Sequence, residues 1–334
     1  MNKLQTTLLI ASVGILTFAG SVNAQTRVKL ASVAPQGTPW ADVMYAIQKR
    51  INSESGGKYN VKVYPGGQLG GENEILAGVR GGRIEFAGLT TGAVANVVPE
   101  LNVLEMPYLF DNIGQADCVL DNHLIEPVSG LLTSKGMVFI SWAENGFRSI
   151  GMKGKAIKVP ADLSGVKVRS QEAKTHIQFW KSVGASPIPI AIPEVLPALQ
   201  TGVVTAFDNT PLFTMAAEWQ TTIDNFTFTK HIYQPALIVV SKSFHDKQPA
   251  ENRSIIVGKT NELAGEVRKG VRALDGRLVA TLKKTGVAIH NPSAAELAQW
   301  KAASAGQEKT VLPKLGGKSK AIYDAVIKGK SACK

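Results

Sequence analysis

The sequence predicts an α/β fold of two similar domains with a ligand-binding crevice between them. Three observations predict it. The chain has 334 residues, about twice the usual length of one domain. Strand-like segments alternate with helical segments of about ten residues, which is typical of βαβ units and a parallel sheet. A stretch of eleven residues also matches, in its pattern and without a gap, a second stretch at an offset of 120 residues.

The first strand and helix are indicated by two different periodicities. Residues 27–33 alternate apolar and polar side chains, as a half-buried strand does. Thr38 and Pro39 then provide an N-cap and a proline in the first turn of a helix. One apolar stripe follows at helical spacing: Trp40, Val43, Met44, Ile47 and Ile51. We expect this helix to end at Gly56 and Gly57.

The next elements continue the alternation. Residues 61–64 read as a strand, stopped by Pro65 and two glycines. Residues 72–80 then predict a second helix, and residues 84–89 predict a third strand. These strands should be parallel, because each pair is joined through a helix.

The repeat relates residues 74–84 to residues 194–204. In each copy a helix with an apolar face ends at a glycine where a C-terminal cap needs positive φ, and a strand follows at once. A strand at 166–169 and a helix at 173–183 precede the second copy. Two such α/β domains leave a crevice at the carboxyl ends of their strands, where open sheets of this class bind ligands.

A long helix is predicted after the second domain. Six apolar residues recur at spacings of three and four: Leu263, Val267, Val271, Leu274, Leu278 and Leu282. Roughly thirty residues from Glu251 would extend about 45 Å, enough to run across both domains. Its outward face carries Lys269, Arg272, Arg277 and Lys283, which we interpret as solvated. We expect domain I to comprise residues 25–146 plus about 233–272, and domain II residues 147–232 plus about 273–334.

Residues 1–24 predict a secretory signal peptide. Lys3 precedes an apolar stretch at residues 8–19, and small residues follow at positions 22 and 24. The stretch is too short to span a bilayer comfortably, so we expect a mature protein that begins at Gln25 and is free in an exported compartment.

The chain is basic, with 37 Lys and Arg against 26 Asp and Glu and a net charge of +11. Removal of Lys3 leaves +10, which favours anionic partners. Export and the scattered placement of the basic residues argue against nucleic acid. Cys118 and Cys333 are available for one disulfide, and the sequence leaves their pairing open.

Catalytic patterns are missing. The sequence has no GxSxG, HExxH or CxxC motif and no GxGxxG after a strand. Its five histidines, His123, His176, His231, His245 and His290, show no metal-ligand spacing. We therefore expect no enzyme, no cofactor and no metal site, although an exported enzyme whose residues meet only in space stays an alternative.

The remaining polar candidates are suited to holding an anion. Arg169 ends the predicted strand 166–169, so its guanidinium should reach the mouth of the crevice and bind a carboxylate through two parallel hydrogen bonds. Arg148 lies near a domain crossover, and Asn209 ends the strand 204–208 with an amide that donates and accepts. A surface salt bridge, or an ordinary turn before Pro211, is the structural alternative for these residues.

Four motifs together resemble a known family. They are Gln68-Leu69-Gly70-Gly71, the MPYLF segment at 106–110, PADLSGVKVR at 160–169, and residues 194–209. In this order they are similar to the periplasmic solute receptors of tripartite ATP-independent periplasmic (TRAP) transporters, DctP type. The resemblance implies a periplasmic-binding-protein fold of type II-like form. It also implies a receptor that closes on a small carboxylate and delivers it to the small and large subunits of a membrane permease.

The resemblance also implies a set of ligand-binding residues. Arg169 matches the arginine that clamps the carboxylate, Arg148 a second arginine in the cleft, and Asn209 the asparagine at a strand end. Weaker matches place four residues at or near the cleft wall: Glu72, Thr90, Glu172 and Trp40. Thr90 and Ala93 stand where sialic-acid receptors carry Glu and Arg, which disfavours sialate. The substrate-binding protein of an ATP-driven (ABC) importer is the alternative with the same bilobed form.

Overall fold

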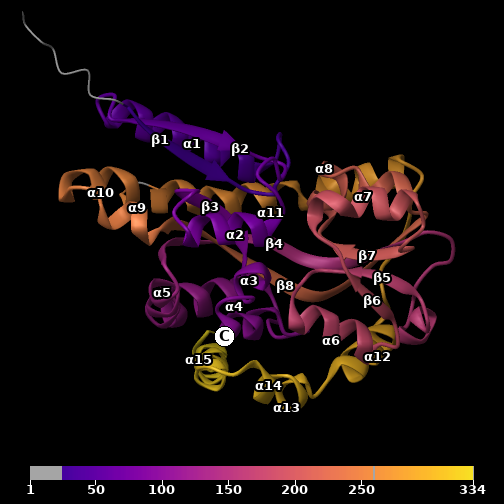
Figure 1. Cartoon of the computed structure of the whole chain (residues 1–334). Helices are drawn as coiled ribbons and strands as arrows, with labels where there is room; N and C mark the ends of the chain where they lie inside the picture. Colours follow the sequence, from indigo (N-terminus) through magenta and orange to yellow (C-terminus); the bar gives the residue numbers. More distant parts are fainter. Residues whose placement is uncertain (1–24, 259, 334) are drawn as a thin grey trace, which may run out of the picture.

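The computed structural model describes residues 25–258 and 260–333, so the expected signal peptide lies outside the described residues. Two lobes stand side by side, with helix α11 (Thr260–Lys284) running across both (Figure 1). One sheet passes through both lobes in the order β2-β1-β3-β8-β4-β7-β5-β6, with β9 (Ala288–His290) paired to β8. The predicted α/β class and the two-domain form are confirmed.

Lobe I is built on three parallel strands: β1 (Thr26–Ala31), β2 (Tyr59–Tyr64) and β3 (Phe86–Thr90). Helices α1 (Pro39–Glu54), α2 (Glu72–Arg80) and α3 (Thr91–Val94) connect or follow them. The Thr38 side chain accepts a hydrogen bond from the Ala41 amide, as an N-cap does. The apolar stripe of α1, from Trp40 to Ile51, is buried. These elements lie close to their predicted bounds.

Lobe II repeats this arrangement. Its parallel strands are β5 (Lys167–Ser170), β6 (Ser186–Pro189) and β7 (Ala206–Asn209), and its helices include α6 (Lys174–Ser182), α7 (Ile192–Gln200) and α8 (Pro211–Ala216). Gly82 and Gly202, which follow α2 and α7, have φ of 70° and 75°. Thr90 and Thr210, again 120 residues apart, both cap the next helix. The internal repeat is therefore confirmed in three dimensions.

Two long strands, β4 (Met137–Met152) and β8 (Asn225–Ser241), pass through both lobes as an antiparallel pair. In lobe I, β3 pairs with residues 236–240 of β8, and in lobe II, β7 pairs with residues 149–152 of β4. We predicted parallel strands only, so these antiparallel pairs were not expected. Irregular register near Glu144 and Arg148 interrupts the pairing between the lobes. Our proposed domain boundaries, after residues 146 and 232, fall within these two strands.

Shorter elements complete the two lobes. They are η1 (Pro99–Glu105), α4 (Ile113–Val119), η2 (Leu120–Leu124), α5 (Ile125–Ser134), η3 (Pro160–Leu163), η4 (Trp219–Thr222), α9 (Lys242–Asp246), α12 (Ala294–Ser304), α13 (Gln307–Thr310), α14 (Leu312–Leu315) and α15 (Ser319–Ala332). Each lobe has a separate hydrophobic core on either face of the sheet.

The predicted helix of about thirty residues is two helices. α10 (Ala250–Val257) ends at Gly258, whose φ of −35° and ψ of −106° are not helical, and α11 covers 25 residues, or about 38 Å. α11 packs against α1 of lobe I and α8 of lobe II. The prediction that a long helix spans both lobes is thus confirmed, although its start was placed about nine residues too early.

One residue of the face that we interpreted as solvated forms ion pairs with other elements of the fold, whereas Lys269 pairs with the exposed Glu266 of the same helix. Arg272 of α11 binds the buried carboxylate of Glu144, with Nε to Oε1 at 2.8 Å, and also binds Asp117 in lobe I. These two hydrogen-bonded carboxylates raise the pKa of Arg272 well above its ordinary value. The interpretation was wrong for Arg272 because two carboxylates distant in sequence meet it.

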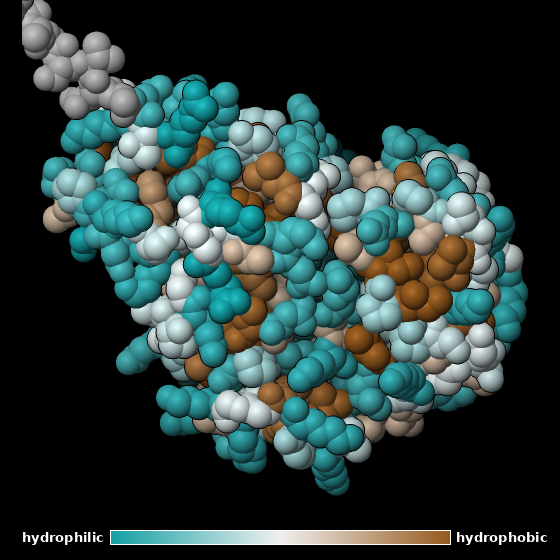
Figure 2. Space-filling view, viewed as in Figure 1, coloured by the Kyte–Doolittle hydropathy of each residue, from teal (hydrophilic) through white to brown (hydrophobic). Residues whose placement is uncertain are grey.

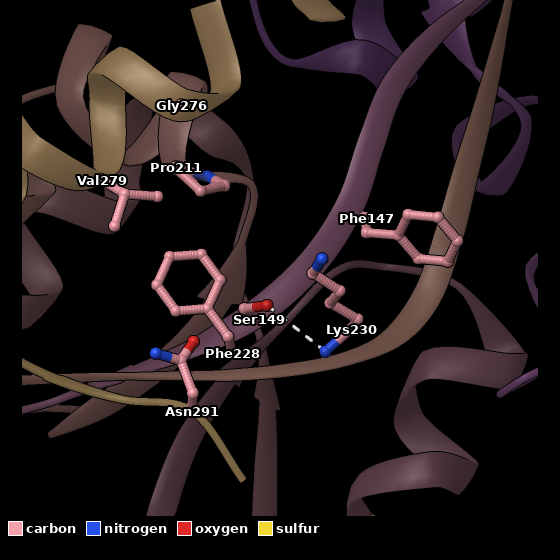
Figure 3. A pocket seen from close by; sticks show the side chains of 8 residues that line it. All are labelled: Phe147, Ser149, Pro211, Phe228, Lys230, Gly276, Val279 and Asn291. Carbon is pink, nitrogen blue, oxygen red and sulfur yellow. Dashed lines mark hydrogen bonds between the residues drawn. The ribbon is translucent and has the colours of Figure 1, made fainter. Parts of the chain in front are cut away.

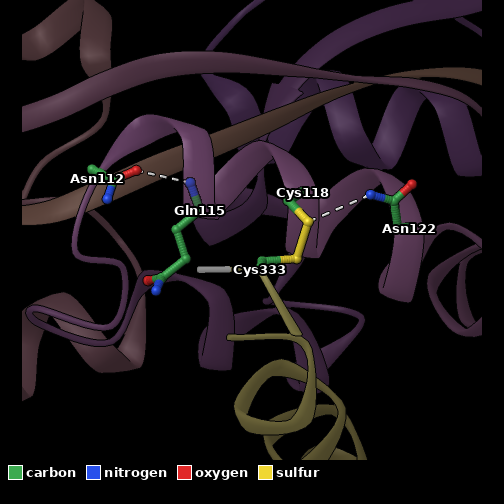
Figure 4. The surroundings of a disulfide bond; sticks show 5 residues. All are labelled: Asn112, Gln115, Cys118, Asn122 and Cys333. Atoms are coloured by element: carbon green, nitrogen blue, oxygen red, sulfur yellow. Dashed lines mark hydrogen bonds between the residues drawn. A yellow bond between two sulfur atoms is a disulfide. The ribbon is translucent and has the colours of Figure 1, made fainter. Parts of the chain in front are cut away.

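The C-terminal segment packs on lobe I. Val311, Ile322 and Val326 belong to a core of that lobe, and Cys333 forms a disulfide with Cys118 of α4 (Figure 4). This pairing was left open by the sequence. Our expectation assigned residues 273–334 to domain II. We now propose that residues 311–333 belong with domain I, because their core contacts and their disulfide lie there.

The face shown in Figure 2 is largely hydrophilic, with separate apolar patches, the largest on lobe II beside α7. No helix within the described residues combines the length and the apolar composition that a membrane crossing requires.

Candidate functional site

The candidate site lies where strand ends from both lobes meet. Thr90 ends β3 in lobe I, whereas Arg169 lies one residue before the end of β5 and Asn209 ends β7 in lobe II. These three predicted residues therefore lie at the carboxyl ends of strands, where open α/β sheets bind ligands. Helices α2 and α7, related by the repeat, both begin here without a capping side chain.

Arg169 is 1% exposed. Its Nε and Nη2 atoms both donate to the carbonyl oxygen of Ile190, at 3.0 and 2.8 Å, and its guanidinium lies 5.6 Å from the ring centroid of Trp219. Its Nη1 atom is buried and has no hydrogen-bond partner among the described residues. A guanidinium has five N–H donors, so the edge formed by Nη1 and Nη2 still offers two parallel donors.

The buried positive charge of Arg169 carries a desolvation cost. Burial, followed by the nearby positive charge of Arg148, lowers the pKa of Arg169 to about 10. The side chain is still protonated at neutral pH, yet no carboxylate among the described residues forms an ion pair with it. A buried cation with an unused donor edge is a suitable site for an anion that enters from outside.

Arg148 is held differently. Its Nε donates to Asp208 Oδ2 at 2.5 Å, its Nη1 to Gln234 Oε1 at 2.7 Å, and its Nη2 to the Asp208 carbonyl oxygen at 2.5 Å. All three nitrogens of this buried side chain thus serve protein acceptors. We expected Arg148 to be a second arginine for the ligand, but its nitrogens bind Asp208 and Gln234 behind the cleft.

Asn209 is oriented by its carbonyl oxygen. This atom accepts from the Thr210 amide at 2.8 Å and from Arg148 Nη1 at 3.4 Å. The Nδ2 atom of Asn209 has no hydrogen-bond partner among the described residues, so it keeps a donor for a ligand. Asn145, which the sequence analysis missed, donates to Asn209 Oδ1 at 3.3 Å. Its position on β4 beside a register irregularity carries no motif that would have revealed it.

Glu72 and Thr90 form a second polar pair. The Thr90 amide donates to Glu72 Oε1 at 2.7 Å, and the Thr90 hydroxyl donates to Oε2 at 2.9 Å. Burial raises the pKa of Glu72 to about 7, against the opposing effect of these hydrogen bonds. Gln171, from lobe II and also missed by the sequence analysis, donates to the Thr90 hydroxyl at 2.8 Å.

Two small pockets meet at Glu72. One is lined mainly by lobe I, and the side chains that matter here are Trp40, Glu72, Thr90, Asn145 and Phe213. The other lies between the lobes, lined by Glu72, Asn73, Ala93, Asn96, Arg169, Gln171, Glu172 and Ile192. Every predicted site residue except Arg148 and Asn209 lines one of these two pockets. Arg148 and Asn209 are hydrogen-bonded to each other, and Asn209 is also bonded to Asn145, which lines the first pocket.

The two lobes touch across this cleft. Asn73 Nδ2 of lobe I donates to Glu172 Oε1 of lobe II at 3.0 Å. At the same edge, a Cβ on Gly71 would lie 3.2 Å from the Cβ of Ala191 at the start of α7. Only glycine leaves ordinary space for this approach. The lobes therefore stand in a closed arrangement, with the site enclosed between them.

A buried ionic network lies beneath the site and was not foreseen. Glu105 of lobe I contacts His176 Nε2 of lobe II at 2.5 Å, and Asp208 contacts His231 Nε2 at 3.3 Å. Burial alone would raise the pKa of Asp208, but Arg148 and the bond from His231 hold it well below its ordinary range. These residues are far apart in sequence and form no motif, so no signal could have found them.

Another cavity, of about 280 Å³, lies outside the cleft (Figure 3). It is bounded by β4, β8, α8 and α11, and aromatic and aliphatic side chains such as Phe147, Phe228 and Val279 dominate it. Lys230 is the one charged residue among the eight that line it, and none of the predicted ligand-binding residues lies there. This cavity therefore does not compete with the cleft as the candidate site.

Glu72 should make the stability of the protein depend on pH. Its pKa of about 7 in the folded chain lies above its ordinary value of 4.5, so between these pH values the folded protein keeps a proton that the unfolded chain has lost. Rising pH should therefore remove about 3 kcal/mol of stability across this window. We expect Glu72→Gln to abolish this component, measured as the difference between urea-unfolding free energies of the two proteins from pH 4.5 to 8. A difference that does not change with pH would contradict the assignment.

Comparison with known proteins gives a consistent result. Residues 30–311 match the family model described as bacterial extracellular solute-binding protein, family 7, or DctP. A solute-binding protein of Verminephrobacter eiseniae is 31% identical over 266 residues, covering 80% of this chain and 79% of that protein.

Two solved structures are also similar. A TRAP periplasmic solute-binding protein of Bordetella bronchispeptica, with density assigned to pantoate, has a TM-score of 0.81 and 29% identity over 90% of this chain and 99% of that one. The sugar-acid-binding protein of Advenella mimigardefordensis, in complex with galactonate, has a TM-score of 0.88 at 23% identity over 93% and 99%. The similarity to the Advenella protein supports the fold alone.

Proposed function

Because this chain belongs to family 7 of the bacterial extracellular solute-binding proteins, the DctP family, we propose that it binds one small organic carboxylate between its lobes and delivers it to a TRAP-type secondary transporter. The family consists of solute receptors, so the chain is a binding protein and not an enzyme. Membership of this family also favours a TRAP transporter over an ATP-driven importer.

The observation that carries this proposal is the buried donor edge of Arg169. A carboxylate bound there accepts two parallel hydrogen bonds from Nη1 and Nη2 and neutralises a cation that otherwise has no ion-pair partner among the described residues. The uncapped N-termini of α2 and α7, nine residues each, add backbone N–H groups and partial positive charge at the same place.

We assign the other residues by their place around Arg169. Asn209 offers its free Nδ2 to the ligand, Trp40 lines the apolar end, and Glu72, Thr90 and Glu172 line the polar end. Arg148 orients Asn209 and stays out of contact with the ligand. Closing of the lobes about β4 and β8 excludes water and strengthens the ion pair with Arg169.

The remaining steps follow from this role. The protein works in the periplasm after removal of residues 1–24, and the small and large subunits of the membrane permease recognise its closed form. Lobe closure brings the two faces of the cleft mouth together, so ligand binding changes the surface that the permease meets.

The proposal is tested by thermal unfolding of residues 25–334 with a panel of small carboxylates. A ligand at 100 times its dissociation constant stabilises the folded protein by about 2.7 kcal/mol, which raises Tm by several degrees for a protein of this size. We expect one class of acid to give such a shift and matched uncharged amides to give none. If protein stripped of bound ligand by unfolding and refolding responds to no acid, the proposal is wrong.

A further inference from the structure

We propose that the cleft selects hydroxylated acids with a single carboxylate and rejects dicarboxylates, with Glu72 as the selecting residue. This inference rests on the proposed function and names its substrate class. It follows from the charges that line the two pockets, from the contacts that already occupy them, and from the position of Glu72 between the pockets.

The cleft offers one available cation. Arg169 is the only cationic side chain among the residues that line the two pockets. Arg148, directly behind them, is already neutralised by Asp208 at 2.5 Å and gives every nitrogen to a protein acceptor. A first carboxylate on Arg169 therefore uses the one unpaired cationic side chain among these lining residues.

Above neutral pH, where Glu72 is ionised, the opposite wall carries negative charge. Glu72 and Glu172 line the same pocket as Arg169, one from each lobe. Within the described part of the chain, the buried Glu72 is bonded only to Thr90 and forms no ion pair with a basic side chain. A second ligand carboxylate would have to lie against Glu72 or Glu172 in a closed, poorly hydrated space, where like charges repel strongly.

Ligand hydroxyl groups, unlike a second carboxylate, can be accommodated at this wall. A carboxylate oxygen accepts about two hydrogen bonds, and each oxygen of Glu72 has accepted one, from Thr90. Glu72 can therefore accept a ligand hydroxyl without losing its present partners. The amides of Asn73, Asn96 and Gln171 surround the same pocket and both donate and accept. This wall suits alcohol groups and not a second anion.

The test uses acid pairs that differ only at one end. D-Erythronate and meso-tartrate share four carbons and both secondary hydroxyls, but the first ends in CH₂OH and the second in a carboxylate. Glycerate with tartronate, and gluconate with glucarate, provide a shorter and a longer pair. Affinities are measured by titration calorimetry at pH 8, where Glu72 and both carboxylates of each diacid are ionised. We expect the monoacid of the pair that fits to bind at least about tenfold more tightly.

Two variants identify the selecting residue. Glu72→Gln keeps the shape and removes the charge, so it should strengthen diacid binding at least about tenfold and reduce the ratio within the pair. Glu74→Gln, an exposed position on the same helix, is the matched control and should leave the ratio unchanged. Unfolding of each variant in urea checks that the fold is intact.

The possible results separate the two proposals. A diacid that binds as tightly as its monoacid, or more tightly, overturns the selectivity while the receptor function stands. Selectivity that survives in Glu72→Gln overturns the role of Glu72. Binding of no acid in any pair, and of none in the wider carboxylate panel, counts against the receptor function itself.

Discussion

Replacing Arg169 by alanine should weaken carboxylate binding by several kcal/mol, equivalent to a loss of at least about a hundredfold in affinity. The substitution removes the one unpaired cation among the residues that line the cleft and leaves the ligand anion in a closed site without a counter-charge. Titration calorimetry with the acid that stabilises the unaltered protein most measures the effect. Unchanged affinity in this variant would show that Arg169 does not bind the ligand.

Two further variants separate binding from folding. Arg169 also bonds to the Ile190 carbonyl oxygen and lies over Trp219, so its loss lowers stability as well. Arg169→Lys keeps the positive charge but loses the parallel donor edge, and we expect it to bind the acid more weakly than the unaltered protein and more tightly than the alanine variant. Arg277→Ala removes the same charge from an exposed position on α11 and should bind normally.

Replacing Asp208 by alanine should lower the free energy of unfolding by about 3–5 kcal/mol. Asp208 is fully buried, and its Oδ2 atom accepts from Arg148 at 2.5 Å and from His231 at 3.3 Å. Its removal leaves the guanidinium of Arg148 buried without its ion-pair partner. Urea denaturation at pH 7 measures the loss.

The controls for this prediction use a second pair and a double substitution. Asp246, paired with Lys242 at the surface, should tolerate alanine with no measurable change, because exposed ion pairs contribute little. Arg148→Met combined with Asp208→Leu replaces both charges by apolar groups and should recover part of the lost stability. A double variant no more stable than Asp208→Ala would indicate that other contacts of these residues dominate.

The local elements of each lobe could be predicted because their signals lie within short stretches of sequence. Neighbouring residues determine the Thr38 cap, the apolar stripe of α1 and the glycines after α2 and α7. The internal repeat gave the prediction of the second pair of elements independent support. β4 and β8 were not predicted as lobe-spanning strands, because their length is fixed by partners far away in sequence. The break at Gly258 was missed because apolar spacing continues on both sides of it.

The candidate site shows the same division. Arg169 and Asn209 follow from one rule, that the ends of parallel strands meet at one edge of a sheet, whereas Thr90 was expected only from the family resemblance. The role of each side chain depends on residues that are distant in sequence. Asp208 forms an ion pair with Arg148, and the Ile190 carbonyl oxygen orients Arg169. Burial raises the pKa of Glu72. Gln171 and Asn145 carry no motif, so only the folded chain places them in the cleft wall.

The disulfide of Cys118 and Cys333 has a topological consequence for the whole molecule. The two cysteines are 215 residues apart, and everything in lobe II, together with β4, β8 and α11, lies between them. The bond therefore closes a covalent ring that contains one lobe entirely and is anchored on the other. A protease that cuts the chain once inside this ring produces no separate fragment. A nicked receptor keeps both halves of its binding site on one molecule until the bond is reduced.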